Sequence, residues 1–432
     1  MHRLQHISLV FCGIVLCITF LLYSSVSWQN HVWLMPLPYV TMNYSLASLS
    51  DTDLASLRVH DGINDTSGPY YKLVVSASKK FPYYYKPISF HSTQQFRQRV
   101  SYNVNLKSGR QTSHGNQSKI ILFYNAPEWF RNFKDACPNG LTKCPQRDCV
   151  CSYDPTQISS ADAVLIDLVQ LSDSIPPAKE GKQVWIMFGL ECPNYFESQV
   201  HQSQQWRRVF NWSMTYRLDS DIALPYNVLL RTETHTSANF TKIALEKTKS
   251  VLWFASNCET PSKREHYIAE LRKHIPTDVY GKCGSPMCSY GGDCQRSFFG
   301  EYRFYLAFEN SLCVDYISEK LHKVYSENIV PVVRGGADYN SLIPKGTYIN
   351  AADFSSPKEL ATYLKYLETN VTAYAEILEA KSRYIHSDEK TTYESAFCDI
   401  CVKLHNLDQY RQYYYDSARW LHENTCHSPK DF

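Results

Sequence analysis

The chain has 432 residues, a formal net charge of +2 at pH 7 and 14% aromatic residues, among them 32 tyrosines. This length allows two domains of ordinary size together with extensions. The near-neutral charge argues against a chain that binds nucleic acid or an anionic membrane through a polybasic surface. The many aromatic side chains suit carbohydrate recognition but do not establish it.

The N-terminus carries an uncharged, mostly apolar run at residues 7–23, preceded by Arg3. Its length is the lower limit for a membrane-spanning helix and slightly long for the core of a signal peptide. A basic residue with no acidic residue before the run favours a cytoplasmic tail at residues 1–6. The small residues 25–27 leave a cleaved signal peptide as the alternative. In both cases the rest of the chain is expected to cross the membrane.

Sequons and cysteines indicate the same side of the membrane. Beyond the apolar run, Asn-x-Ser/Thr sequons occur at Asn43, Asn64, Asn116, Asn211, Asn239 and Asn370. Most of the 15 cysteines also follow the run, which is typical of an oxidising compartment. We therefore predict a lumenal chain that carries N-linked glycans. Residues 24–115 lack sustained periodicity and are predicted to form a stem.

A first α/β domain is predicted over residues 116–240. Apolar runs suited to buried strands lie at residues 120–124, 163–166 and 184–188, separated by polar or proline-containing segments. Four cysteines lie between the first two runs, namely Cys137, Cys144, Cys149 and Cys151. None of them forms a CxxC pair, so disulfides are favoured over a zinc site.

Two acidic motifs follow in this domain. Glu191 comes directly after the third apolar run and, taken alone, is most simply a surface residue in a turn. Asp219 and Asp221 form an Asp-x-Asp motif, and paired carboxylates suit Mg²⁺ or Mn²⁺ bound to a nucleotide diphosphate. Such matches are common by chance, so a structural role is the alternative.

A polar stretch at residues 237–249 predicts the change to a second domain, taken as residues 241–400, with a C-terminal extension at 401–432. The apolar run at residues 251–255 predicts its first strand, which ends in Ser256 and Asn257. The segment around Tyr280 predicts a further short strand followed by a glycine turn.

A helix is predicted to follow this first strand, with Thr260 as N-cap, Pro261 at the first helical position and an end near Lys273. Arg264 falls in its first turn, beside the strand-end loop, where a cation suits an anionic ligand. The alternative is an exposed helix arginine.

The clearest pattern in the chain spans residues 304–333. Apolar runs at 304–308 and 329–333 flank a helix, which predicts a βαβ crossover in a parallel sheet covered on both faces. Loops at the carboxyl ends of such strands face a ligand crevice, and helix N-termini there hold anions. The polar residues at this edge are Glu309, Asn310, Tyr316, Glu319 and Lys320. The alternative makes Glu319 and Lys323 an ordinary i,i+4 surface pair.

These motifs resemble the α1,3-fucosyltransferases of glycosyltransferase family 10. Phe-Glu-Asn, Asp-Tyr-Ile-Ser-Glu-Lys and Val-Pro-Val-Val, within residues 308–333, are similar in order and spacing to the donor-binding signature of the family, with Ser318 where threonine is usual. The segment around Glu191 resembles the one that carries the catalytic base, with Cys192 in place of the usual serine. The segment around Asp219 and Asp221 resembles an acceptor-side stretch that is not a metal clamp.

The resemblance covers about residues 119–401 and implies a fold and a reaction. The fold is α/β of GT-B type, with two Rossmann-like domains facing a cleft, preceded by a transmembrane anchor and a stem. The reaction moves L-fucose from GDP-fucose to the 3-hydroxyl of GlcNAc with inversion, and Glu191 is the general base. The implied donor-binding residues are Ser256, Asn257, Arg264, Tyr280, Glu309, Asn310, Tyr316, Glu319 and Lys320. No metal is required, and Mn²⁺ is a candidate stimulator.

The same resemblance implies a single-pass type II protein of the Golgi membrane that acts on glycoprotein or glycan acceptors and binds no nucleic acid. Homodimerisation through the anchor or stem stays open. The cysteine-rich loop of Cys283, Cys288 and Cys294 is similar to that of invertebrate members. Cys398 and Cys401 form a CxxC motif, for which a short disulfide is favoured over a redox pair or half a zinc site.

Alternatives to this reaction come from other classes. One is a metal-dependent GT-A transferase that uses Asp219 and Asp221, and the other is an inactive lumenal glycan-binding protein. Within the favoured class the acceptor stays open between the N-glycan core GlcNAc, antennal LacNAc or LacdiNAc, and a glycolipid.

Overall fold

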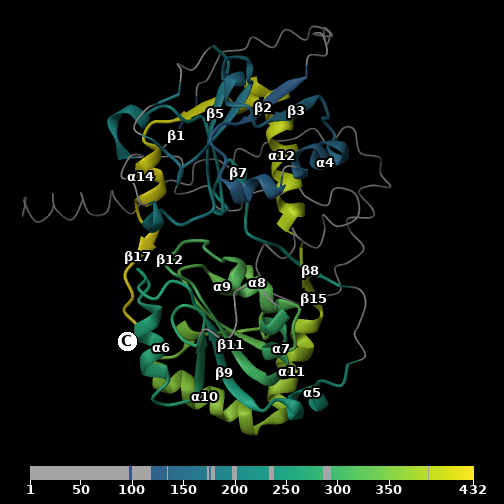
Figure 1. Ribbon diagram of the computed structural model, residues 1–432, viewed down its shortest axis with the longest axis vertical. Helices are drawn as coiled ribbons and strands as arrows, with labels where there is room; N and C mark the ends of the chain where they lie inside the picture. The colour runs from purple at the N-terminus through teal and green to yellow at the C-terminus, as the bar shows by residue number, and fades with distance from the viewer. Residues whose placement is uncertain are drawn as a thin grey trace, which may run out of the picture. The chain divides into compact units, whose positions relative to one another are not determined.

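The computed structural model describes residues 97–99, 118–133, 135–172, 175–176, 181–196, 202–232, 238–285, 293–387 and 389–432 (Figure 1). All of these belong to one compact unit, residues 65–432. The predicted tail, the anchor, nearly all of the stem and the sequons at Asn43, Asn64 and Asn116 lie outside the described residues. Within them, no helix combines the length and apolar character needed to cross a membrane.

The first sheet contains, among the described residues, six parallel strands in the order β3-β2-β4-β5-β6-β7. They are β2 (Lys119–Phe123), β3 (Cys149–Ser152), β4 (Ala163–Asp167), β5 (Val184–Gly189), β6 (Trp212–Thr215) and β7 (Ile222–Ala223). The three predicted apolar runs are confirmed as β2, β4 and β5. Strands β4 and β5 are buried along their whole length, as expected for a parallel sheet covered on both faces.

Short helices connect these strands. They are η2 (Glu128–Phe133), α4 (Ala136–Lys143), η3 (Pro155–Ser160), η4 (Pro193–Tyr195) and η6 (Gln204–Trp206). The cysteines between β2 and β4 form the predicted disulfides, since Cys137 pairs with Cys151 while Cys144 and Cys149 pair with residues near the C-terminus.

The second sheet contains, in the part of the chain described, five parallel strands in the order β10-β9-β11-β13-β14. They are β9 (Lys249–Phe254), β10 (Thr277–Tyr280), β11 (Tyr302–Phe308), β13 (Val330–Arg334) and β14 (Ile349–Asn350). The predicted βαβ unit is confirmed, because β11 pairs with β13 in parallel and α8 (Glu319–Tyr325) connects them. Two buried clusters cover the two faces of this sheet.

The other helices of this half are α5 (Phe240–Glu246), α6 (Arg264–Leu271), α7 (Asp293–Glu301), α9 (Tyr339–Leu342), η7 (Ala351–Asp353), α10 (Pro357–Thr369) and α11 (Val371–Ser382). The start predicted for α6 is wrong. The helix begins at Arg264, and the N-cap position is held by Lys263 in the left-handed region (φ 51°). The Thr260 hydroxyl instead donates to Glu265, in a turn that precedes the helix.

Three small antiparallel pairs complete the strands of the described residues. They are β1 (Arg97–Arg99) with β16 (Gln412–Tyr414), β8 (Leu229–Arg231) with β15 (Tyr384–His386), and β12 (Leu312–Cys313) with β17 (Cys426–His427). The last pair is also joined by the disulfide Cys313–Cys426. A further disulfide, Cys258–Cys283, connects the loops that follow β9 and β10.

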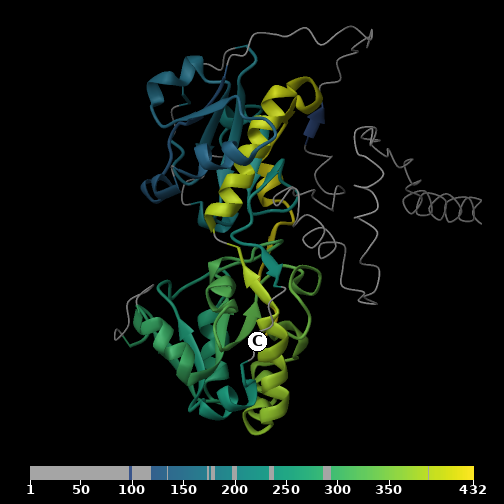
Figure 2. The ribbon, with the colours of Figure 1, turned by 90° about the vertical axis from the view of Figure 1, so that its right-hand side faces the viewer.

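After α11 the chain returns to the first sheet. Helix α12 (Glu389–His405) lies against the strands of the first sheet (Figure 2). Its buried side chains, among them Phe397 and Ile400, belong to the same core as those of β2, β4, β5 and β6. Helices α13 (Leu407–Tyr410) and α14 (Ser417–His422) follow it. The predicted boundary at residue 400 therefore lies inside a helix of the first sheet's core.

The predicted short disulfide between Cys398 and Cys401 is wrong. Cys398 pairs with Cys144 and Cys401 pairs with Cys149. The two cysteines lie on successive turns of one face of α12, and this face packs against α4 and β3, where each finds its own partner. The sulfur atoms of Cys149 and Cys401 lie close to His405. Because they are bonded to each other in a disulfide, they are not available as thiolate ligands of a metal.

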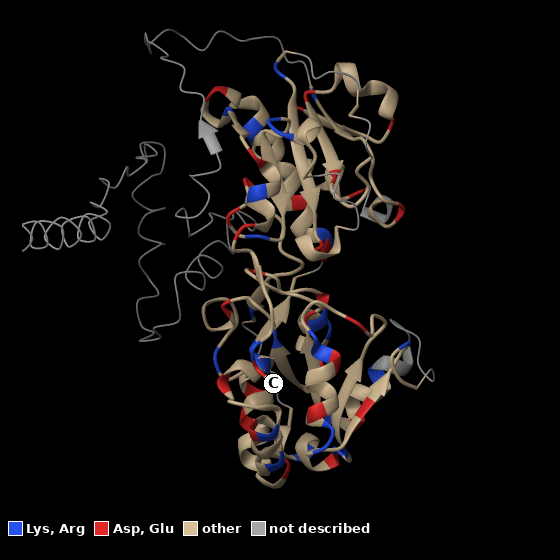
Figure 3. Cartoon of the chain, turned by 90° about the vertical axis from the view of Figure 1, so that its left-hand side faces the viewer, with Lys and Arg blue, Asp and Glu red and all other residues tan. Residues whose placement is uncertain are grey.

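In the cartoon of Figure 3, basic and acidic residues are interspersed along the described helices and strands. This distribution agrees with the near-neutral net charge of the chain.

Candidate active site

The carboxylate of Glu191 lies just beyond the end of β5. Two hydrogen bonds from tyrosines fix this segment: the Tyr226 hydroxyl donates to the Leu190 carbonyl at 3.0 Å, and the Tyr316 hydroxyl donates to Glu191 Oε2 at 3.2 Å. Tyr226 follows β7 of the first sheet, whereas Tyr316 lies in the loop before α8. The Glu191 carboxylate therefore meets the loop of the predicted βαβ unit, and the interpretation of Glu191 as a surface residue in a turn is wrong.

Burial raises the pKa of Glu191 above its usual range. Lys320 and the hydrogen bond from Tyr316 oppose this effect, while the carboxylates of Glu319 and Glu309 add to it. A carboxylate with a raised pKa is a stronger proton acceptor than an ordinary surface glutamate. This environment suits a general base.

Helix α8 begins at an anchored N-terminus. Ser318 is its N-cap, and its backbone N–H and hydroxyl donate to the two carboxylate oxygens of Glu309 at 2.8 and 2.7 Å. Glu309 is fully buried, at 0% exposure. Its carboxylate therefore orders the loop before α8, and its predicted role in donor binding stays a prediction.

The side chain of Lys320 is about one-fifth exposed beside this anchor. Its Nζ donates to Ser318 Oγ at 2.7 Å and lies 3.3 Å from Glu309 and 3.5 Å from Glu319. Burial lowers the pKa of Lys320, but the two carboxylates outweigh it and the net effect is a raised pKa. Lys320 is therefore a permanent cation, and its position in the first turn of α8 adds to the favourable field for an anion.

Arg264 is buried, so the interpretation as an exposed helix arginine is wrong. Its Nη1 donates to the Phe308 carbonyl at 2.8 Å and its Nη2 to the Asn257 carbonyl at 3.2 Å. Its buried Nε has no hydrogen-bond partner among the described residues. Arg264 also lowers the pKa of Lys320, which shows that the two cations act on the same region.

The remaining predicted donor-side residues fall into different surroundings. Ser256 and Asn257 are exposed in the loop after β9, and Asn257 Nδ2 donates to the Tyr195 hydroxyl, close to Glu191 in the chain. Asn310 follows Glu309 and has a buried Oδ1 with no partner in the described part of the chain. Tyr280 is buried, with its hydroxyl 3.1 Å from that of Tyr302, so its side chain belongs to the packing of the second sheet.

The Asp-x-Asp motif has a structural role. Asp219 forms a buried bidentate pair with Arg217 at 2.9 and 2.8 Å, and Arg217 also donates to the Trp420 carbonyl. Asp221 accepts hydrogen bonds from Ser213 and Tyr414. The two carboxylates thus hold the first sheet and the returning C-terminal segment together.

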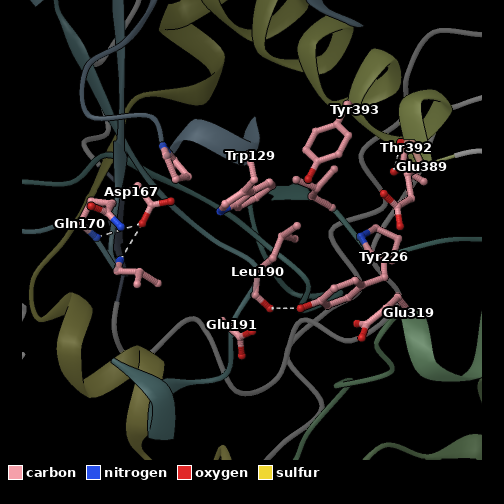
Figure 4. A pocket seen from close by; sticks show the side chains of 14 residues that line it. Trp129, Asp167, Gln170, Leu190, Glu191, Tyr226, Glu319, Glu389, Thr392 and Tyr393 are labelled. Carbon is pink, nitrogen blue, oxygen red and sulfur yellow. Dashed lines mark hydrogen bonds between the residues drawn. The ribbon is translucent and has the colours of Figure 1, made fainter. Parts of the chain in front are cut away.

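A cavity of about 310 Å³ opens beside Glu191 (Figure 4). Trp129 and Tyr393 form one side of it, and Glu191 and Glu319 lie on the other. Its volume is at the low end of the range of about 300–1,000 Å³ typical of small-molecule sites. The cavity is lined by Pro127, Trp129, Asp167, Val169, Gln170, Leu190, Glu191, Leu224, Pro225, Tyr226, Glu319, Glu389, Thr392 and Tyr393.

Asp167 is a lining residue that reasoning from the sequence missed. It ends β4, and its Oδ1 accepts hydrogen bonds from the backbone N–H groups of Val169 and Gln170. Burial raises the pKa of Asp167 to about 6, although these hydrogen bonds oppose the shift. The signal was available, because Asp167 follows an apolar strand just as Glu191 does. A parallel sheet brings both strand ends to the same edge.

Two family models match the chain. "Fucosyltransferase, N-terminal" matches residues 116–227, and "Glycosyltransferase family 10 (fucosyltransferase) C-term" matches residues 244–420. Among curated proteins, the chain is 32% identical over 334 residues to an alpha-(1,3)-fucosyltransferase C of Drosophila melanogaster, which covers 70% of this chain and 76% of the relative.

Two further relatives are similar to the chain. A glycoprotein 3-alpha-L-fucosyltransferase A of Drosophila melanogaster is 34% identical over 318 residues, covering 71% of this chain and 61% of the relative. An alpha-(1,3)-fucosyltransferase of Caenorhabditis elegans is 31% identical over 297 residues, covering 66% of this chain and 65% of the relative. The chain therefore belongs to glycosyltransferase family 10, the fucosyltransferases.

Proposed function

We propose that this protein is an inverting α1,3-fucosyltransferase that moves L-fucose from GDP-fucose to the 3-hydroxyl of GlcNAc in glycoprotein acceptors, foremost on N-glycans. The observation that carries the proposal is the position of Glu191. Its carboxylate, with a raised pKa, lines the cavity and meets the loop that carries Tyr316 and Lys320. The names of the family relatives support the same reaction.

In this reaction the acceptor hydroxyl attacks the anomeric carbon of fucose from the side opposite GDP, which inverts that centre. Glu191 takes the hydroxyl proton as the new glycosidic bond forms. The bond between fucose and the diphosphate breaks, and its electron pair leaves with GDP. Lys320 and Arg264 stabilise the negative charge that develops on the leaving diphosphate.

The buried Nε of Arg264, which lacks a partner among the described residues, is a donor available to this anion. Two cations suffice for charge stabilisation, so we propose that no divalent metal is required and that Mn²⁺ at most stimulates the rate. The alternative use of Asp219 and Asp221 as metal ligands is disfavoured because both carboxylates are engaged by protein donors.

We also propose the cellular setting. The two parallel sheets form a GT-B enzyme, with the acceptor bound beside the first sheet and GDP-fucose beside the second. Residues 7–23 anchor the chain as a type II protein of the Golgi membrane, and the stem follows them and ends before β1, which pairs with β16. The cysteine content and the disulfides that tie α12 to the first sheet support an oxidising lumen for the catalytic part.

The test is to incubate the full-length protein in detergent with GDP-fucose and a panel of acceptors. The panel contains N-glycans with an exposed core GlcNAc, LacNAc and LacdiNAc antennae, and a glycolipid. We expect transfer to at least one acceptor, with an α1,3 linkage by product analysis and full activity in EDTA. Absence of transfer to every member, with folding intact, would refute the proposal and favour an inactive glycan-binding protein.

A further inference from the structure

Three tyrosines surround the segment that carries Glu191. The ring of Tyr316 packs edge-on against Tyr216, with centroids 4.9 Å apart, and against Tyr226 at 6.1 Å. Tyr316 is only 1% exposed, so neither face of its ring is open to a ligand. Its one hydrogen-bonding group, the hydroxyl, donates to Glu191.

The backbone of Tyr316 is held from several directions. Cys313 is joined to Cys426 by a disulfide, and the Tyr316 N–H donates to the Cys313 carbonyl at 3.2 Å. Asp315, in the left-handed region (φ 60°), accepts a hydrogen bond from the backbone N–H of Leu218 at 3.1 Å. The loop is thus tied to both the first sheet and the C-terminal strand, which leaves the Tyr316 hydroxyl little freedom to move away from Glu191.

We propose that Tyr316 is a positioning residue for Glu191. Its hydroxyl, bound to Oε2, holds the carboxylate in the orientation in which the other oxygen can take the proton from the hydroxyl of the acceptor sugar. This inference rests on the proposed function, and the donor-binding role predicted for Tyr316 from the sequence is the alternative that the experiment below tests. Tyr226 completes the arrangement by binding the Leu190 carbonyl, so that one tyrosine fixes the backbone and another fixes the side chain. Tyr316 acts through Glu191 and is not itself a catalytic residue.

The chemistry of the pair fits this role. Burial raises the pKa of Tyr316 well above its usual value, and the neighbouring Tyr226 and Glu191 add to the shift. The phenol therefore keeps its proton and always has a hydrogen to donate. A donor to the ionised form of a carboxylate stabilises that form, so the loss of this bond raises the pKa of Glu191 further.

Besides Tyr316, the charged groups that act on the pKa of Glu191 are Lys320 and Glu319 on α8 and Glu309, which follows β11. Glu191 in turn raises the pKa of Tyr226, Cys192 and Tyr195 around it, and Tyr226 also shares a hydrogen bond with Tyr316.

The experiment compares Tyr316→Phe with Tyr216→Phe in the full-length protein. Both changes remove one hydroxyl from the same aromatic cluster and keep the rings. The Tyr216 hydroxyl has no hydrogen-bond partner among the described residues, so Tyr216→Phe is the matched control. The measurements are kcat and KM for GDP-fucose and for the acceptor over pH 4.5 to 8, together with GDP binding as a check of folding.

For Tyr316→Phe we expect kcat to fall about tenfold and the acid limb of its pH profile to move up by about one pH unit, with KM for GDP-fucose unchanged. Tyr216→Phe should match the wild type in kcat, in the position of the acid limb and in KM for GDP-fucose. A raised KM for GDP-fucose with an unmoved acid limb would overturn the inference in favour of a donor contact, and an equal shift in both variants would also overturn it. A wild-type protein that transfers fucose to no acceptor would instead refute the proposed function.

Discussion

Replacing Glu191 by glutamine is the most direct test of the proposed chemistry. The change keeps the size and hydrogen-bonding shape of the side chain and removes its capacity to accept a proton. The Tyr316 hydroxyl can still donate to the amide oxygen, so the loop before α8 should stay in place. The neighbouring Lys320 and Arg264 are unchanged, so GDP-fucose should bind as well as before.

The magnitude follows from the role. General-base catalysis raises the rate of a reaction by about 10²–10⁴-fold, so Glu191→Gln should lower kcat by that factor. Even the lower limit corresponds to about 2.7 kcal/mol in the barrier. An uninvolved surface glutamate gives no such loss, and Glu376, exposed on α11, supplies the control variant Glu376→Gln.

The assay measures transfer from labelled GDP-fucose at saturating acceptor, with GDP binding measured separately by calorimetry. The wild-type profile should lose activity as the pH falls through the raised pKa of Glu191, because the base must be ionised. This acid limb should disappear in Glu191→Gln. Near wild-type kcat in the variant, or an unchanged acid limb, would refute the assignment of the base and require another carboxylate, with Asp167 as the next candidate.

Further predictions concern charge, stability and topology. Lys320→Ala and Arg264→Ala should each raise KM for GDP-fucose roughly tenfold to a hundredfold, since a hydrogen bond to a charged group is worth about 1.5–3 kcal/mol; unchanged donor kinetics in both would contradict the anion site. Arg217→Met should lower the free energy of unfolding by about 3–5 kcal/mol in denaturant titrations, because it leaves Asp219 buried without its partner. Lys242→Met, which breaks an exposed pair, should cost about 1 kcal/mol or less. The full-length protein should stay in the membrane after carbonate extraction and shift in gel mobility after peptide N-glycosidase treatment, whereas a soluble product with a new N-terminus near residue 28 would favour a cleaved signal.

The elements that the sequence could predict are those whose residues lie close together in the chain. Apolar runs sufficed for β5 and for the βαβ unit. The start of α6 was missed because Lys263 takes a left-handed conformation that no local pattern announces.

The parts of the site that could not be predicted depend on tertiary contacts. Glu309 has the composition of a ligand-binding residue, and only the folded chain shows that its carboxylate is consumed by Ser318. The pairing of Cys398 was likewise hidden, because its partner Cys144 is 254 residues away and reaches it only after the chain returns to the first sheet. Burial, which sets the pKa of Glu191, also has no signature in the local sequence.

The return of α12 to the first sheet has a consequence for biosynthesis. Cys144 and Cys149 cannot form their disulfides until residues more than 250 positions later have been synthesised. At about 5–20 residues per second, this interval lasts roughly 12 to 50 seconds. During that time the core of the first sheet lacks Phe397 and Ile400 of α12. The domain around the first sheet is therefore synthesised first but completes its core last. A chain cut short before α12 therefore leaves both cysteines without their partners and exposes two reactive thiols on the part that is made first.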